Sequence, residues 1–301
     1  MRTPAHGRPP VASAIAVLVG AVLVVGCAGL VGEVTARESR DLSLAGFTGN
    51  RIRVEVFNGE LTVQPGPDGR VGATVTVTGV GATRPEAEAD RANVITTLSQ
   101  AGNSVVLRAV YWPDPANPRN RGASASVTVP AGSALELVTS NGKVSVTGIG
   151  GAIRIWTSNG ETTIDGATAG VDVETSNSPI TVTGSRGPLA LTSSNGRIRI
   201  DATDAAVKAS TSNGDIAFSG SLAAGSHSFE TSNAAISFRL GADATFGMDL
   251  ETSNARIRVG YPVTATGTAE EARLRGRVGD SPTASISART SNGGITIQPT
   301  E

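Results

Sequence analysis

The sequence predicts an all-β fold, a single-stranded parallel β-helix or β-solenoid with coils of about 18 residues. Two observations lead to this prediction. A short Thr-Ser-Asn-Gly motif recurs between residues 139 and 293, and apolar residues alternate with polar ones on both sides of each copy. A fixed repeat of this kind is typical of proteins in which each unit buries its apolar face against its neighbours.

The asparagine of the motif marks each repeat. The spacing is constant through the first five copies, from Asn141 to Asn213, and it widens in the last three. We expect these side chains to stack as a ladder along one corner, where Asn and Gly would adopt the left-handed backbone conformation of a sharp turn. The asparagines are Asn141, Asn159, Asn177, Asn195, Asn213, Asn233, Asn254 and Asn292.

Four positions around each asparagine are apolar, namely six and four residues before it and three and five after it. This period of two predicts two short strands per repeat, each with one buried side. The positions between them are polar, as at Glu136, Arg154 and Asp172, which stacking would place beside opposite charges. An antiparallel meander with Asn-Gly hairpins also fits the alternation, but it gives no reason for like residues to recur at one offset.

The first 44 residues are expected to lie outside the folded domain. Residues 1–26 resemble a lipoprotein signal peptide, with Arg2 and Arg8 ahead of an apolar run that ends in Val-Val-Gly-Cys at Cys27. Lipidation of Cys27 would tether the chain to the outer face of a bacterial cell membrane, while a signal that is only cleaved remains the alternative. Residues 27–44 lack a sustained period and are interpreted as a flexible tether.

Residues 45–132 are interpreted as an N-terminal region of strands and one capping helix, and residues 133–301 as the repeat array. The helix is expected at about 84–101, because Thr83 and Glu86 form a capping-box pattern and Gly102 follows. Repeat arrays need such a cap. Residues 260–285 interrupt the array and are either a degenerate coil or a loop.

The composition argues against most catalytic and nucleic-acid-binding roles. The formal net charge is −1, so no basic surface for nucleic acid is expected. With two histidines and one cysteine, the chain offers no catalytic triad, no metal site and no cofactor motif, and we expect it not to be an enzyme. His227 is expected to be packed. Glu230 and Glu251 share one outward position and are expected in adjacent coils, but no second row of acids accompanies them.

Three aromatic residues mark a possible binding surface. Tyr111 and Trp112 lie in a proline-rich segment, and Trp156 lies in an outward column of the array. Exposed aromatics suit a sugar or a protein partner. The alternative is that they pack together where the cap meets the array.

Repeated Thr-Ser-Asn-Gly corners between short Val/Ile strands, after a lipobox-like Cys27, resemble the bacterial envelope family called "putative adhesin". The resemblance covers about residues 45–300 and implies a β-helical extracytoplasmic domain without catalytic residues.

The sequence therefore predicts a noncatalytic surface lipoprotein, held by Cys27, whose β-solenoid serves adhesion or contacts an envelope protein or glycan. Two alternatives remain open. One is a glycan-binding or polysaccharide-cleaving β-helix protein, and the other is a scaffold associated with an envelope-sensing system.

Overall fold

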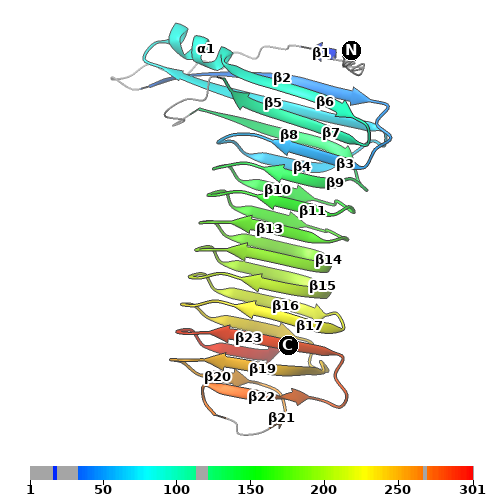
Figure 1. The fold of residues 1–301 in the computed structure, drawn as a ribbon, viewed down its shortest axis with the longest axis vertical. Helices are drawn as coiled ribbons and strands as arrows, with labels where there is room; N and C mark the ends of the chain where they lie inside the picture. The colour runs from blue at the N-terminus through cyan, green and yellow to red at the C-terminus, as the bar shows by residue number, and fades with distance from the viewer. Residues whose placement is uncertain (1–15, 19–32, 113–120, 267–269, 301) are drawn as a thin grey trace, which may run out of the picture.

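A computed structural model of the chain describes residues 16–18, 33–112, 121–266 and 270–300. These described residues form one tall stack of strands with a single helix at its N-terminal end (Figure 1). Within the described ranges, no helix has the length and apolarity needed to cross a membrane. Cys27 and most of the predicted signal peptide lie outside these ranges.

The elements follow one another along the chain with short connections. In chain order they are β1 (Ala16–Leu18), β2 (Val34–Ala45), β3 (Arg51–Glu55), β4 (Leu61–Gly66), β5 (Arg70–Gly81), α1 (Arg84–Ala92), β6 (Val94–Ala101), β7 (Ser104–Tyr111), β8 (Gly122–Pro130), β9 (Ala134–Val138), β10 (Val144–Thr147), β11 (Ile153–Trp156), β12 (Thr162–Asp165), β13 (Val171–Thr175), β14 (Ile180–Ser193), β15 (Ile198–Ser210), β16 (Ile216–Leu222), β17 (Gly225–Glu230), β18 (Ile236–Leu240), β19 (Phe246–Thr252), β20 (Ile257–Val259), β21 (Thr264–Ala265), β22 (Arg273–Val278), β23 (Ala284–Thr290) and β24 (Ile295–Pro299).

Successive repeats pair in parallel and in register. Ile153 pairs with Val171 on one side of the stack, and Val144 pairs with Thr162 on the other. The first face runs in the order β6, β7, β3, β9, β11, β13, β14, β15, β17, β23, β19 and β22. The second face runs β2, β5, β8, β4, β10, β12, β14, β15, β16, β18, β24 and β20. The prediction of a mostly β fold with parallel pairing of the repeats is confirmed.

The inward columns of both faces form one continuous apolar core. Val, Ile and Leu fill it where the coils have their regular length. Where the coil lengthens, between Asn213 and Asn233, phenylalanines enter the core, and Phe229 packs edge-to-face on Phe238 with 4.7 Å between ring centroids. The wider coil thus has larger side chains to fill it, as close packing requires. The core also includes Ile52 and Leu61, so the coil of β3 and β4 belongs to the same stack as the later repeats.

The corner asparagines form a continuous ladder along one edge of the stack. Each Nδ2 donates to the Oδ1 of the asparagine one coil nearer the N-terminal end, for example from Asn159 to Asn141 at 2.6 Å and from Asn195 to Asn177 at 2.7 Å. Asn58, on the corner between β3 and β4, accepts from Asn141 and extends the ladder by one coil.

Close approach of neighbouring coils, rather than a left-handed backbone, explains the corner glycines. A Cβ atom on Gly160 would lie 1.7 Å from the carbonyl oxygen of Gly142, and one on Gly196 would lie 1.8 Å from that of Ser178. Neither glycine has a positive φ, and among the corner asparagines only Asn58 has one, at 48°. The expectation of left-handed corners is therefore wrong in general, because the constraint comes from the adjacent coil.

The expected tether at residues 27–44 is wrong from Val34 onward. Strand β2 pairs along its whole length with β5 in antiparallel orientation. Charged residues interrupt its apolar alternation, which hid the strand in the sequence. Arg40 donates to the carbonyl oxygen of Val94 at 2.6 Å, and Glu38 pairs with Arg40 and Arg91 at 3.1 and 3.2 Å. Val94 and Arg91 belong to β6 and α1, which only the folded chain brings near.

The predicted helix at about 84–101 is half as long as expected. Its start is confirmed, since Thr83 and Glu86 form the capping box, but it ends at Ala92 with Asn93 as the cap. Residues 94–97 are Val, Ile, Thr and Thr, and such β-branched residues favour a strand. They begin β6, which forms an antiparallel hairpin with β7.

A polar cluster connects α1 to the C-terminal end of β7. The Asp90 carboxylate accepts from the Tyr111 hydroxyl at 2.5 Å, from Arg121 at 2.8 Å and from the backbone N–H of Val80 at 2.8 Å. Burial raises the pKa of Asp90, but the hydrogen bonds from Arg121, Tyr111 and Val80 outweigh it, so the pKa is lowered overall. Asp90 thus stays ionised while it connects three segments.

The C-terminal coil is inserted out of sequence order. Strands β23 and β24 lie between the coil of β17 and β18 and the coil of β19 and β20 (Figure 1). The chain first skips one level, covers the end of the stack with β22 antiparallel to β19, and then returns to fill the gap. Residues 260–285 are therefore an excursion rather than a degenerate coil, which explains the long interval between Asn254 and Asn292.

His227 supplies hydrogen bonds to backbone groups where the coil has two extra residues. Its buried imidazole accepts from the backbone N–H of Val207 at Nδ1, 3.2 Å away, and Nε2 lies 2.9 Å from the carbonyl oxygen of Ala223. Backbone pairing between β15 and β17 begins only at Lys208. The neutral Nε2–H tautomer satisfies both backbone groups, and burial lowers the pKa of His227 despite the opposing hydrogen bond to Ala223.

We predict that Gly196→Ala destabilises the protein by about 1–3 kcal/mol, because the added methyl group overlaps the carbonyl oxygen of Ser178. Chemical denaturation measures the effect. Gly132→Ala is the matched control, since a Cβ atom there meets nothing within 4 Å. Equal stabilities of the two variants would contradict the role of close coil approach.

We predict that His227 makes the fold sensitive to acid. Its pKa is lower in the folded chain than the ordinary 6.5, so the unfolded chain binds more protons at intermediate pH. This contribution is complete above about pH 6.5 and is lost as the pH falls towards the folded pKa, at about 1.4 kcal/mol for each pKa unit.

His227→Asn removes the titration and keeps one acceptor and one donor in the side chain. The unfolding free energy of both chains should be measured between pH 7 and pH 5. The wild-type chain is expected to lose more stability than the variant, and identical slopes would contradict this interpretation.

Candidate functional site

The outer side of the first face carries the candidate site. One outward column, here called the charged row, contains Arg53, Glu136, Arg154 and Asp172 on β3, β9, β11 and β13. The next outward column lies two residues earlier in each strand. Its small residues, here called the small-residue column, are Ser104, Ala134, Ala152, Gly170, Pro188 and Ala206, and Arg51 on β3 lies between Ser104 and Ala134. In-register pairing places both columns in straight lines along the stack.

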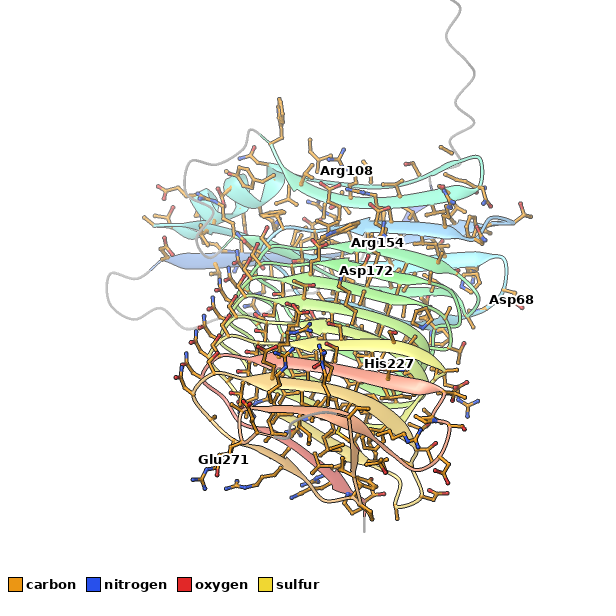
Figure 2. All side chains as sticks on the ribbon, turned by 60° about the horizontal axis from the view of Figure 1, so that its bottom comes forward. Asp68, Arg108, Arg154, Asp172, His227 and Glu271 are labelled. Carbon is orange, nitrogen blue, oxygen red and sulfur yellow. The ribbon has the colours of Figure 1, made fainter. Side chains whose placement is uncertain are left out.

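Charges in the charged row alternate in sign and pair within the chain. Arg154 Nε lies 2.9 Å from the Asp172 carboxylate, and Figure 2 shows the two side chains next to each other. Arg53 is paired with Glu136 and, at 3.6 Å, with Glu55. All four members of the row remain 38–57% exposed, so these are surface pairs of modest strength.

A shallow groove of about 910 Å³ runs beside the charged row. Its floor is the small-residue column, and its lining extends from Ser104 on β7 to Ser226 on β17. The groove exists because Ala, Gly and Pro leave room that larger side chains would fill. Such a surface can accommodate an extended chain or a second sheet face.

The three aromatic residues do not form one platform. Tyr111 is half-buried, bound to Asp90 through its hydroxyl, and packed edge-to-face on Phe57 at 6.3 Å. Trp112 is 69% exposed. Trp156 is half-buried on β11, three strand spacings or about 14 Å from β7, and the guanidinium of Arg154 lies 5.5 Å from its ring.

The expectation that Glu230 and Glu251 occupy adjacent coils is wrong. Arg289, on the inserted strand β23, pairs in register with both positions, and its Nε lies 3.8 Å from Glu251. These three side chains line a polar pocket of about 360 Å³ together with hydroxyl groups of the Thr-Ser corners. The positively charged guanidinium of Arg289 between the two carboxylates suits an ion-pair network better than acid–base catalysis.

In the described part of the chain, no group of three or more His, Cys, Asp or Glu residues is placed to hold a metal ion. The corner asparagines are engaged in their ladder, with each amide group bonded along the stack.

Sequence reasoning found most of the charged row and Trp156 but missed the groove. The sequence does contain the pattern that produces the groove. The residue seven positions before each of five motif asparagines is small or is proline: Ala134, Ala152, Gly170, Pro188 and Ala206. Small residues carry little periodic signal, so only the stacking made the column visible as a surface feature.

Known structures resemble the chain only distantly. One is described as a putative cell adhesion protein from Clostridium sporogenes, with 8% identity over 88% of this chain and 100% of that one and a TM-score of 0.26. Another is a putative adhesin from Bacteroides fragilis, with 14% identity over 89% of this chain and 97% of that one and a TM-score of 0.30. No curated protein matches the chain.

The family comparison is more extensive. A family model described as Toastrack DUF4097 matches residues 49–298, which extend from just before β3 almost to the end of β24. The chain therefore belongs to the Toastrack DUF4097 family.

Proposed function

We propose that the protein is a noncatalytic cell-surface lipoprotein whose β-solenoid presents the outer side of the first face for adhesion or envelope contacts. The observation that supports this most is the parallel pairing of that face from β7 to β19, which aligns equivalent residues of successive coils. Register turns single residues into long rows of exposed groups, and such rows suit an extended contact better than a small substrate.

Lipid anchoring is proposed from the sequence around Cys27. Strand β2 begins at Val34, seven residues after Cys27, at the same end of the stack as α1 (Figure 1). A lipid on Cys27 would hold this end near the membrane and leave the repeats pointing away from it. Two or more acyl chains anchor a protein stably, since each buried CH₂ contributes about 0.8 kcal/mol.

A noncatalytic role is supported by the arrangement of the acidic groups. Glu136 and Asp172 of the charged row are paired with arginines, and Arg289 lies between Glu230 and Glu251. Polysaccharide cleavage needs one carboxyl group as an acid and another as a base or nucleophile across the substrate. Ion-paired carboxylates are poor candidates for the acid.

A glycan ligand is the second candidate, and the exposure of Trp112 favours it. An aromatic ring that is 69% exposed gives a sugar ring a flat apolar surface.

We predict that Cys27→Ser releases the protein from the membrane fraction and abolishes incorporation of a palmitate analogue, because the thiol that carries the lipid is removed. Cell fractionation and metabolic labelling measure both effects. Ala28→Ser is the matched control and keeps the cysteine. An unlabelled wild-type chain would rule out the lipoprotein assignment.

We predict that Trp112→Ala weakens binding of the full-length chain to a soluble glycan or peptidoglycan fragment by about tenfold, if a glycan is the ligand. A binding screen with the wild-type chain identifies the fragment first. Trp156→Ala is the comparison, because Trp156 lies about 14 Å or more away. Absence of binding in the whole screen would exclude the glycan candidate.

A further inference from the structure

We infer that the first face binds a second copy of this chain, face to face and with the two stacks antiparallel. The two-fold axis would run parallel to the strands and pass between β9 and β11. This inference rests on the proposed interaction role of the first face and names its partner. The evidence is the self-complementary order of charges and apolar groups on that face.

The charged row is complementary to its own reverse. Read from β3 to β13, the charges of Arg53, Glu136, Arg154 and Asp172 alternate from positive to negative. Rotation about the proposed axis keeps each column in line and reverses the order of the strands. Arg53 of each copy then faces Asp172 of the other, and Glu136 faces Arg154, giving four opposite-charge contacts.

The match continues beyond the four charges. Val106 on β7 would face Ala190 on β14, so one apolar group meets another. At the next level Ser99 on β6 would face Lys208 on β15. No like charges meet along this row from β6 to β15, and shifting the axis by one coil towards β15 would bring Arg53 against Lys208.

Apolar residues lie next to the proposed axis. Trp156 and Val138 are register partners on β11 and β9, so the rotation places each Trp156 over the Val138 of the other copy. Both side chains are only half-buried in the single chain. A tryptophan at the centre of a contact, surrounded by polar groups, is the arrangement that contributes most to protein–protein affinity.

The small-residue columns allow the two faces to approach. Ala134 would face Ala152, and Arg51 would face Gly170, so no bulky pair obstructs the charged rows. The two grooves would join into one channel between the copies. Ordered water can fill such a channel without weakening a contact that already relies on polar groups.

Two symmetry-related like-charge pairs are expected in the column of Trp156 and Val138, where Glu55 of each copy would face Glu174 of the other. Within its own chain Glu55 is paired with Arg53 at 3.6 Å and with Arg108 at 3.2 Å. Two arginines therefore surround Glu55 and offset the approach of a second carboxylate.

The proposed dimer matches a known mode of sheet packing, and the area of its interface limits its affinity. Strands of the two faces would run in nearly the same direction, as in aligned sheet packing. The matched region from β6 to β15 measures roughly 34 Å by 16 Å, or about 500 Å² per copy. A total of about 1000 Å² is at the lower limit of specific interfaces, so the dimer is expected to be weak and concentration-dependent.

Charge reversal with mixing tests the inference. The acidic-row variant, Arg53→Glu with Arg154→Glu, makes the row entirely negative, and the basic-row variant, Glu136→Arg with Asp172→Arg, makes it entirely positive. Full-length chains in detergent are compared by sedimentation velocity. We expect each variant alone to be monomeric, the wild-type chain to dimerise with concentration, and an equimolar mixture of the variants to form a heterodimer.

Three further measurements guard against misfolded variants. Trp156→Ala should raise the dimer dissociation constant of the wild-type chain by about tenfold or more, while Trp112→Ala should leave it unchanged. Added salt should weaken the wild-type dimer. Thermal unfolding of every variant establishes that it is folded.

A wild-type chain that stays monomeric at every concentration would overturn the inference, as would a mixture of folded variants that fails to associate. Monomers whose charge reversal abolishes glycan binding would assign the face to a glycan instead. The same sedimentation run on Cys27→Ser separates the dimer from the anchor, since dimerisation does not need the lipid.

Discussion

The close approach of neighbouring coils at the Thr-Ser-Asn-Gly corner is the constraint on which the rest of the structure depends. The backbone of one coil occupies the space that a Cβ atom of the next corner glycine would need, as at Gly142 against Gly59. The buried corner threonines add hydrogen bonds in the same direction, for example from Thr211 to the carbonyl oxygen of Gly196 at 3.1 Å. Together with the asparagine ladder, these contacts keep every coil in one register.

Register explains both the core and the surface. Inside, it aligns like side chains in columns, so an array of thin layers becomes one continuous core. Outside, it aligns the equivalent residues of successive repeats into rows with a spacing of about 4.8 Å. The charged row and the small-residue column are consequences of this alignment, and neither needs a loop or a cavity to position it.

The ends and irregular levels of the stack depend on individual residues instead. At the N-terminal end, α1 packs on β5 and β2, and the hydrogen bonds of Asp90 connect it to the end of β7. In the middle, the imidazole of His227 replaces a missing backbone contact of Val207. At the C-terminal end, β22 covers β19 while β23 fills the level that the chain had skipped. Each of these features stabilises the stack at a level where the regular repeat ends or changes length.

The sequence alone was enough to predict the repeat, the buried and outward columns, the parallel pairing and the start of the helix at Thr83, because these depend on local periodicity and capping. It also indicated Trp156 and the alternating charges of Glu136, Arg154 and Asp172, but not their continuation to Arg53. Sequence patterns did not reveal that β2 begins at Val34, that the helix ends at Ala92, or that Arg289 lies between Glu230 and Glu251. These features depend on contacts between segments far apart in the chain, such as Glu38 with Arg91, and no local pattern encodes the order in which coils stack.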